Sequence, residues 1–138
     1  GMTADTNPQR IIPLKPTQGA ELRIGYKDGL TIQADEVDRI LDIVIKNLPK
    51  EDELSAEIVA DYLFECYLEI LNNHTLTREV RVSAFQIVTD LCRHMCGNNN
   101  DFIFEVHALL NNKVQKYTSE TLEIQRKMIK ILRDEFYR

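Results

Sequence analysis

The chain has 138 residues, which is enough for one domain that buries roughly two-thirds of its unfolded surface. Its net charge of −5 weighs against broad nucleic-acid binding and against adsorption to an anionic membrane, because both require clustered Lys and Arg side chains. With 43% hydrophobic residues the chain should be globular, and no apolar run approaches the roughly 20 residues of a membrane span. Three cysteines and no visible signal peptide fit a reducing compartment, so we expect an intracellular protein, cytoplasmic or nuclear.

Residues 1–20 are expected to form an extended arm, because three of the four prolines fall within them. Gly1, which precedes Met2, looks like a cloning scar. Residues 21–34 alternate apolar and polar side chains, and a three-residue loop at 27–29 would turn them into a short β-hairpin. An isolated hairpin is marginal in water, so it would have to rest on the helices or on another chain.

From Asp35 onward apolar side chains recur every three or four residues, which predicts a helical domain over residues 35–138. Pro49 should stop the first helix, Thr77 is a good N-cap, and Gly97 suits the residue after a helix end. We expect five helices: one from about 35 to Pro49, one from about 52 to 72, one between Thr77 and Gly97, one beginning near Asn100 or Asp101, and one from Ser119 to the end.

The last expected helix divides into an apolar half and a polar half. Such a helix is suited to close a helical stack, which would make the C-terminus a boundary of the domain. The apolar half holds Leu122, Ile124, Met128, Ile129, Ile131, Leu132 and Phe136. The polar half holds Arg126, Lys127, Lys130 and Arg133 together with Glu123 and Asp134.

Two stretches of the chain match each other at an offset close to forty residues. Tyr62–Asn73 and Asp101–Asn112 align their apolar positions, and both end in Leu-Asn-Asn. Beyond the asparagines the offset grows by two, and Thr77 and Glu79 fall on Thr118 and Glu120. A period near forty is typical of stacked helical hairpins, which bury their apolar faces on each other.

The stretch Val80-Arg81-Val82-Ser83-Ala84 follows an apolar helix and a short polar turn, and spaced aliphatic side chains come after it. This pattern resembles a HEAT or armadillo-type repeat. The second copy has Thr121-Leu122 and Gln125 where the family has Val-Arg and Ala. The resemblance implies an all-α, five-helix HEAT/armadillo-like stack or bundle that presents a surface to protein partners.

Arg81 falls within the apolar arc of its expected helix. A guanidinium there must be paired and hydrogen-bonded, or must lie at the mouth of the turn. We expect a structural ion pair between helices, with Glu65, Glu69 or Glu120 as the acceptor; contact with a ligand is the alternative.

An acidic row marks the second expected helix: Glu53, Glu57, Asp61, Glu65 and Glu69 recur every four residues, with no Lys or Arg between Glu51 and Asn72. Phe64 and Leu68 point into the same arc. Apolar anchors with a charged rim are typical of a surface that binds a basic-apolar peptide or helix. The alternative is that the first helix, the hairpin or the arm covers these two side chains.

No arrangement of side chains predicts catalysis or a bound metal. Cys92 and Cys96 share a helix face, but His94 projects away from them, so the three cannot converge on one ion. Neither His74 nor His107 belongs to a nucleophile motif. We therefore expect no cofactor, no metal site and no catalytic residue.

The hypothesis favoured by these observations is a non-catalytic protein-interaction or scaffold module that binds through Phe64, Leu68, Glu57, Asp61 and Glu65. Self-association is a second way for such a small stack to cover its apolar edges. The alternative is a nucleic-acid or nucleoprotein module that uses the basic face of the last helix, although the interleaved acids and the net charge disfavour it.

Overall fold

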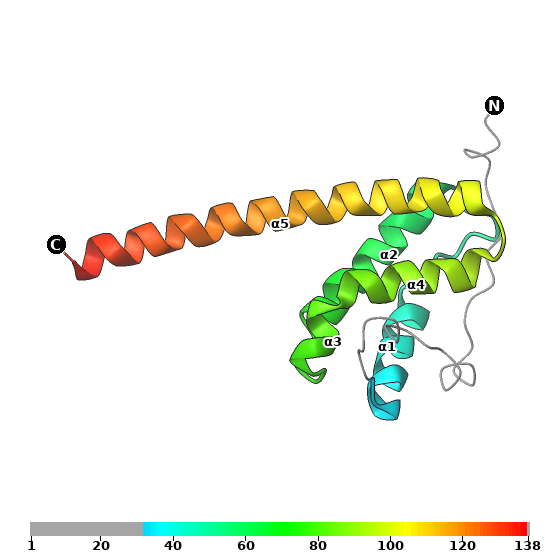
Figure 1. Ribbon diagram of the computed structural model, residues 1–138, viewed down its shortest axis with the longest axis horizontal. Coiled ribbons are helices and arrows are strands. Elements are labelled where there is room, and N and C mark those ends of the chain that lie inside the picture. Colours follow the sequence, from blue (N-terminus) through cyan, green and yellow to red (C-terminus); the bar gives the residue numbers. More distant parts are fainter. Residues whose placement is uncertain (1–31, 138) are drawn as a thin grey trace.

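The computed structural model describes residues 32–137, and this part of the chain is all-α, as expected. The predictions for the arm at 1–20 and for nearly all of the hairpin at 21–34 lie outside the described residues. The helices are α1 (Ala34–Lys46), α2 (Ala56–Leu71), α3 (Arg78–Val82), α4 (Ala84–Cys96) and α5 (Asn100–Phe136). In Figure 1, α1 to α4 form a body, and α5 lies across that body and then extends far beyond it.

Three predicted helix ends are confirmed. Thr77 caps α3, and its Oγ1 accepts a hydrogen bond from the N–H of Val80 (3.4 Å). Gly97 follows α4 with a φ of 64°, a backbone conformation that glycine adopts at little cost. Helix α5 begins at Asn100, where the Asn99 side chain accepts from the N–H of Phe102 (3.1 Å).

Two other ends differ from the expectation because side chains cap the backbone earlier or later than the apolar pattern suggests. Helix α1 ends at Lys46 and does not reach Pro49; the Asn47 side chain donates to the carbonyl of Ile43 (2.9 Å). Helix α2 begins at Ala56 rather than near Asp52, because Ser55 is the N-cap and accepts from the N–H of Ile58 (3.2 Å).

The helix expected between Thr77 and Gly97 is divided in two at Ser83. The N–H of Ser83 donates to the carbonyl of Val80 (3.1 Å), an i to i−3 bond that tightens the end of α3. The carbonyl of Ser83 then accepts from Ile87 (3.0 Å) and starts α4. Serine and β-branched valine are weak helix formers, so the break falls where helical geometry is least favoured.

The separate fourth and fifth helices of the expectation are wrong: α5 is a single helix of 37 residues. The stretch between Asn112 and Ser119 contains neither Gly nor Pro, and each of its residues tolerates helical geometry. The helix therefore continues through this stretch. The stretch Tyr62–Asn73 therefore closes a helix, whereas Asp101–Asn112 opens one that runs on.

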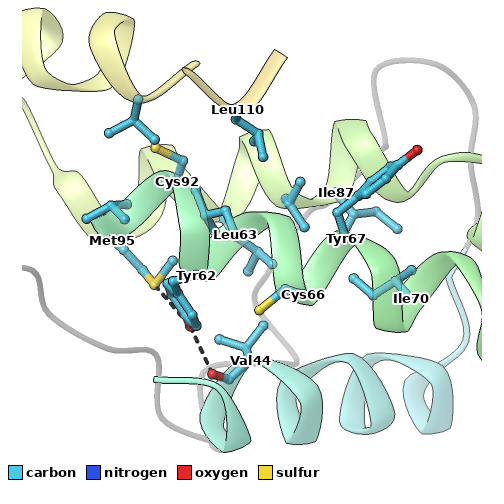
Figure 2. Close-up of a cluster of buried hydrophobic side chains, with 14 of the residues drawn as sticks. Val44, Tyr62, Leu63, Cys66, Tyr67, Ile70, Ile87, Cys92, Met95 and Leu110 are labelled. Atoms are coloured by element: carbon cyan, nitrogen blue, oxygen red, sulfur yellow. Dashed lines mark hydrogen bonds between the residues drawn. The ribbon is translucent and has the colours of Figure 1, made fainter. Parts of the chain in front are cut away.

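Helix α2 is the centre of the core, because it packs against α1, α4 and α5. Leu63, Cys66 and Ile70 on α2 are completely buried. The Tyr62 hydroxyl, also buried, donates to the carbonyl of Val44 in α1 (2.9 Å) and lies 3.9 Å from the sulfur of Met95 in α4, as Figure 2 shows. The hydrogen bond satisfies the one polar group that this tyrosine carries into the core.

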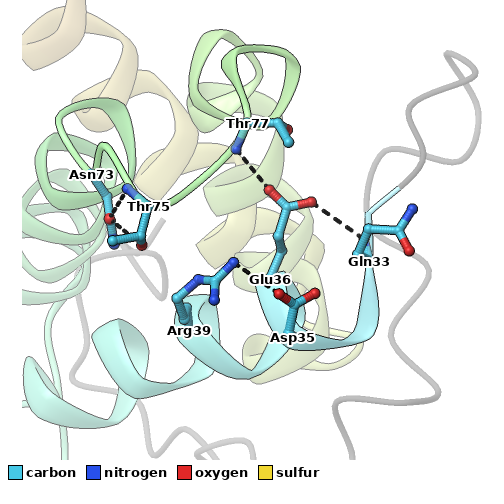
Figure 3. Close-up of polar contacts among 7 residues, drawn as sticks. All are labelled: Gln33, Asp35, Glu36, Arg39, Asn73, Thr75 and Thr77. Carbon is cyan, nitrogen blue, oxygen red and sulfur yellow. Dashed lines mark hydrogen bonds and ion pairs between the residues drawn. The ribbon is translucent and has the colours of Figure 1, made fainter.

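A buried carboxylate ties the start of α1 to the start of α3 (Figure 3). Glu36 is only 3% exposed, and its two oxygens accept from different backbone N–H groups: Gln33 at 3.4 Å and Thr77 at 2.8 Å. The residue thus caps its own helix and fixes a second helix 41 residues away in sequence. On the exposed side of α1, Arg39 forms an ion pair with Asp35 (3.1 Å).

Candidate protein-interaction surfaces

The predicted binding residues of α2 lie on one outward strip, as their spacing requires. Glu57, Asp61 and Glu65 are exposed, whereas Phe64 and Leu68 are half-buried and pack against the core cluster. We call these five residues the α2 strip. It offers carboxylates to a partner, but its two apolar anchors are only partly accessible.

Helix α5 covers Phe64, and this differs from the expected covers, which were the first helix, the hairpin and the arm. The Phe64 ring stacks on Tyr67 (centroids 6.0 Å apart) and meets Tyr117 of α5 edge-on (6.2 Å). Tyr117 also meets Tyr67 edge-on (6.4 Å). The Lys113 ammonium lies over the Phe64 ring at 5.8 Å. These aromatic contacts form the last packed layer between α5 and the body.

Ion pairs border the α2 strip on both sides. Towards α5, Asp61 pairs with Lys113 (2.6 Å). Towards α1, the Glu69 carboxylate accepts from Lys46 and from the Asn47 side chain, both at 2.6 Å. Hydrogen bonds from Lys46 and then Asn47 lower the pKa of Glu69 below its ordinary value of 4.5.

The exposed carboxylates of Glu57 and Glu65 form no ion pair with any other residue of 32–137. Because α2 contains no Lys or Arg, its outward strip keeps an excess of negative charge between the α1 and α5 borders.

The ion pair expected for Arg81 is not formed with any residue that the structure describes. Its guanidinium is half-buried, and its Nε is buried without a hydrogen-bond partner. Of the expected acceptors, Glu69 is engaged with Lys46 and Asn47, and Glu120 lies on the exposed part of α5.

Among residues 32–137, the largest uncovered apolar surface lies on α5, where the sequence predicted side chains that close a stack. We call residues 119–137 the α5 tail. Every residue from 122 to 137 is exposed, and the tail projects away from the body in Figure 1. Its large apolar side chains are uncovered by 44% to 83%: Leu122, Ile124, Met128, Ile129, Ile131, Leu132, Phe136 and Tyr137.

The same tail carries a basic row. Arg126, Lys127, Lys130 and Arg133 follow one another within eight residues, and Glu123 is the only acid between Leu122 and Arg133. The wide apolar arc covers about half of the helix circumference, and cations border it on its two edges. The tail therefore has the amphipathic, basic-apolar character that the sequence led us to expect in a partner of the α2 strip.

The buried thiols and the half-buried histidine are held in their uncharged forms. Burial raises the pKa of the Cys66 thiol to about 12, and the nearby Glu69 carboxylate acts in the same direction. The sulfurs of Cys92 and Cys96 lie 3.8 Å apart, and this contact together with burial raises the pKa of Cys92. Burial, aided by Arg93, lowers the pKa of His107.

Within residues 32–137, His, Cys, Asp and Glu side chains nowhere gather in threes as a metal site would require. None of the five described helices combines the length and the apolar character needed to cross a bilayer. Comparison of the chain with known protein families, with curated proteins and with solved structures finds no match.

Proposed function

We propose that this chain is a non-catalytic protein-interaction module and that the α5 tail is its principal binding element. One observation carries the proposal: a helix held firmly at its root exposes an unbroken apolar face along its outer half. A helix of this kind is recognised when its apolar face enters a complementary surface on another protein. Three free cysteines fit an intracellular, reducing location.

The size of the exposed face supports an interface rather than incidental exposure. The large apolar side chains of the tail present on the order of 800–1,000 Å² to solvent, whereas the largest apolar patch of a typical monomer covers only about 300–600 Å². A standard interface takes about 800 Å² from each partner. One partner helix or groove along the tail would therefore remove most of this surface from water.

The α2 strip is a secondary element of the same proposal. Its carboxylates favour a partner with cations, and Leu68 with the edge of Phe64 supplies a small apolar contact. The HEAT or armadillo-type resemblance supports the same class of role for the hairpin that α2 makes with α3 and α4, since repeats of this kind serve as binding scaffolds.

Site-specific photocrosslinking in the native cells tests the proposal. A benzophenone amino acid replaces Ile129 on the apolar face in one variant and Glu123 on the opposite face in the matched control. We expect protein adducts at position 129 and few at position 123. Equal labelling at both positions, or no adduct at 129, would show that the apolar face is not a binding surface. Adducts to DNA or RNA would instead favour the nucleic-acid module that the basic row suggests.

A further inference from the structure

The apolar surface of α5 is one continuous stripe that is covered at its root and bare at its end. Side chains seven residues apart along one edge of this stripe are Ile103, Leu110, Tyr117, Ile124 and Ile131. The first three pack on the body, whereas Ile124 and Ile131 are 59% and 62% exposed. The face that binds the chain's own body thus continues past the point where that body ends.

A second edge of apolar side chains makes the bare stripe wider than one neighbouring helix can cover. Leu122, Ile129 and Phe136 are also seven residues apart. Leu122 and Ile129 each lie two residues from the matching side chain of the first edge, which places the two edges about 160° apart around the helix. A two-helix seam uses a narrower stripe than this. The tail is therefore suited to lie against more than one helix, as it would on a folded body.

The charges of the tail favour the α2 strip as the surface that it binds. Residues 126–133 of the tail hold four cations and no acid, whereas the four acids of the tail lie outside this stretch. These cations complement α2, which carries four acids and no base. The two elements also match in length: the helical part of the tail spans about 27 Å and α2 about 24 Å. The strip lies on the tail's own chain, but α5 leaves α2 at the Tyr117 layer and carries its own tail away from it.

We propose that the occupant is a second copy of this chain: the tail of each copy lies along the α2 strip of the other, in a two-fold dimer. This inference rests on the proposed function, because it names the partner of the same surface. Arg126 and Lys130 face the carboxylates of Glu57 and Glu65, and apolar side chains of the tail cover Leu68. A two-fold arrangement uses both surfaces of both chains, so it closes without leaving a free tail.

Pairing of the two tails with each other would also bury these apolar side chains, but it is less favourable than binding to the α2 strip. Over residues 122–133 it brings together two sets of four cations with only the two Glu123 carboxylates between them, because the other acids of the tail, Glu120, Asp134 and Glu135, lie towards its ends. The helical tail is also only about two and a half heptads long, which is short for a free-standing coiled coil. The body of a second copy supplies what a second tail lacks, namely negative charge and a larger packed surface.

Two charge-reversed full-length chains test the arrangement. The tail-reversed chain carries Arg126→Glu and Lys130→Glu, and the strip-reversed chain carries Glu57→Lys and Glu65→Lys. Asp61 is left unchanged because it pairs with Lys113, and lysines at 57 and 65 each lie four residues from its carboxylate, which favours the helix. Exposed Glu79→Lys on α3 is the matched control.

Light scattering after size exclusion, over a dilution series, gives the mass of each chain. We expect a dimer for the native chain and for the control, and a dissociation constant raised by about tenfold or more for each reversed chain alone. The equimolar mixture of the two reversed chains restores the dimer, because each tail then meets a strip of opposite charge. Rising salt weakens the native dimer.

Three results would overturn the proposal. A strip-reversed chain that associates like the native one would show that the tails bind elsewhere. A mass that grows beyond two copies would exclude closure. A native chain that stays monomeric throughout would exclude self-association, and adducts of position 129 with a different protein would then still uphold the proposed function.

Discussion

At the scale of single residues, the buried polar groups of Tyr62 and Glu36 each have a definite structural role. The Tyr62 hydroxyl donates a hydrogen bond to the Val44 carbonyl, and the Glu36 carboxylate accepts hydrogen bonds from two backbone N–H groups, one at the start of α1 and one at the start of α3. Such groups are costly when a partner is removed, because a buried donor or acceptor is left without a hydrogen bond. They are therefore the positions where small chemical changes should have large effects.

Glu36→Ala should lower the free energy of unfolding by about 1.5–3 kcal/mol, the range for hydrogen bonds to a charged group. The change leaves the N–H of Thr77 without its acceptor and separates the starts of α1 and α3. Glu36→Gln keeps one oxygen and should cost less. Urea denaturation followed by circular dichroism measures both, with exposed Glu79→Gln as the control. A loss no larger than that of the control would show that Glu36 does not link the helices.

His107 should make the protein less stable as the pH falls. Burial and the nearby Arg93 lower its folded-state pKa, although the Thr89 carbonyl and Asp90 act in the opposite direction. A histidine with a depressed pKa contributes stability that is complete above its unfolded pKa of about 6.5 and is lost as the pH falls towards the folded value. Unfolding midpoints in urea at pH 7.5 and below 6.5 should therefore differ more for the native chain than for His107→Leu.

The matched control for this pH dependence is His94→Gln on the exposed side of α4. It leaves His107 in place and should retain the difference between the two pH values. Equal pH dependence of the native chain and His107→Leu would assign the effect to other groups.

At the scale of elements, one helix serves two environments. The root of α5 is core, with Phe102, Val106 and Leu110 buried, whereas the tail carries apolar side chains of similar size in solvent. Packing, rather than residue type, therefore decides the energetic weight of each leucine on this helix.

A pair of identical substitutions on α5 measures that difference. Leu110 is completely buried and Leu132 is 53% exposed. Leu110→Ala should destabilise the chain by about 2–5 kcal/mol because it opens a cavity. Leu132→Ala should change the stability of the dilute monomer by less than about 0.5 kcal/mol. Thermal unfolding at low concentration checks both; a large effect at Leu132 would mean that the tail is packed within its own chain.

At the scale of the whole molecule, the helix caps could be predicted from the sequence, whereas the segments that cover each surface from far along the chain could not. Thr77, Gly97 and the start at Asn100 follow from capping rules that involve only a few neighbouring residues. The continuity of α5 was missed because the internal match suggested a boundary before Ser119, whereas no residue there breaks a helix.

The candidate surfaces divide in the same way. Helical spacing placed Glu57, Asp61 and Glu65 together on an exposed strip, and the structure agrees. The cover over Phe64 could not be read from spacing, because Tyr117 and Lys113 reach it from a helix about fifty residues away. Periodicity likewise identified the apolar half of the tail but could not say whether anything lies on it, since the same pattern serves a core and an interface.

The uninterrupted helix makes the molecule a lever. The lever pivots at the aromatic contacts among Phe64, Tyr67 and Tyr117, and the helical part of the α5 tail beyond them is about 27 Å long. A tilt of about 10° at the fulcrum would swing the far tip through roughly 5 Å, which is about one helical pitch. A partner bound at the tip is therefore mechanically coupled to the packing of the three rings at the root of the tail. A change in that packing would change the direction of the tail without altering any atom that contacts the partner.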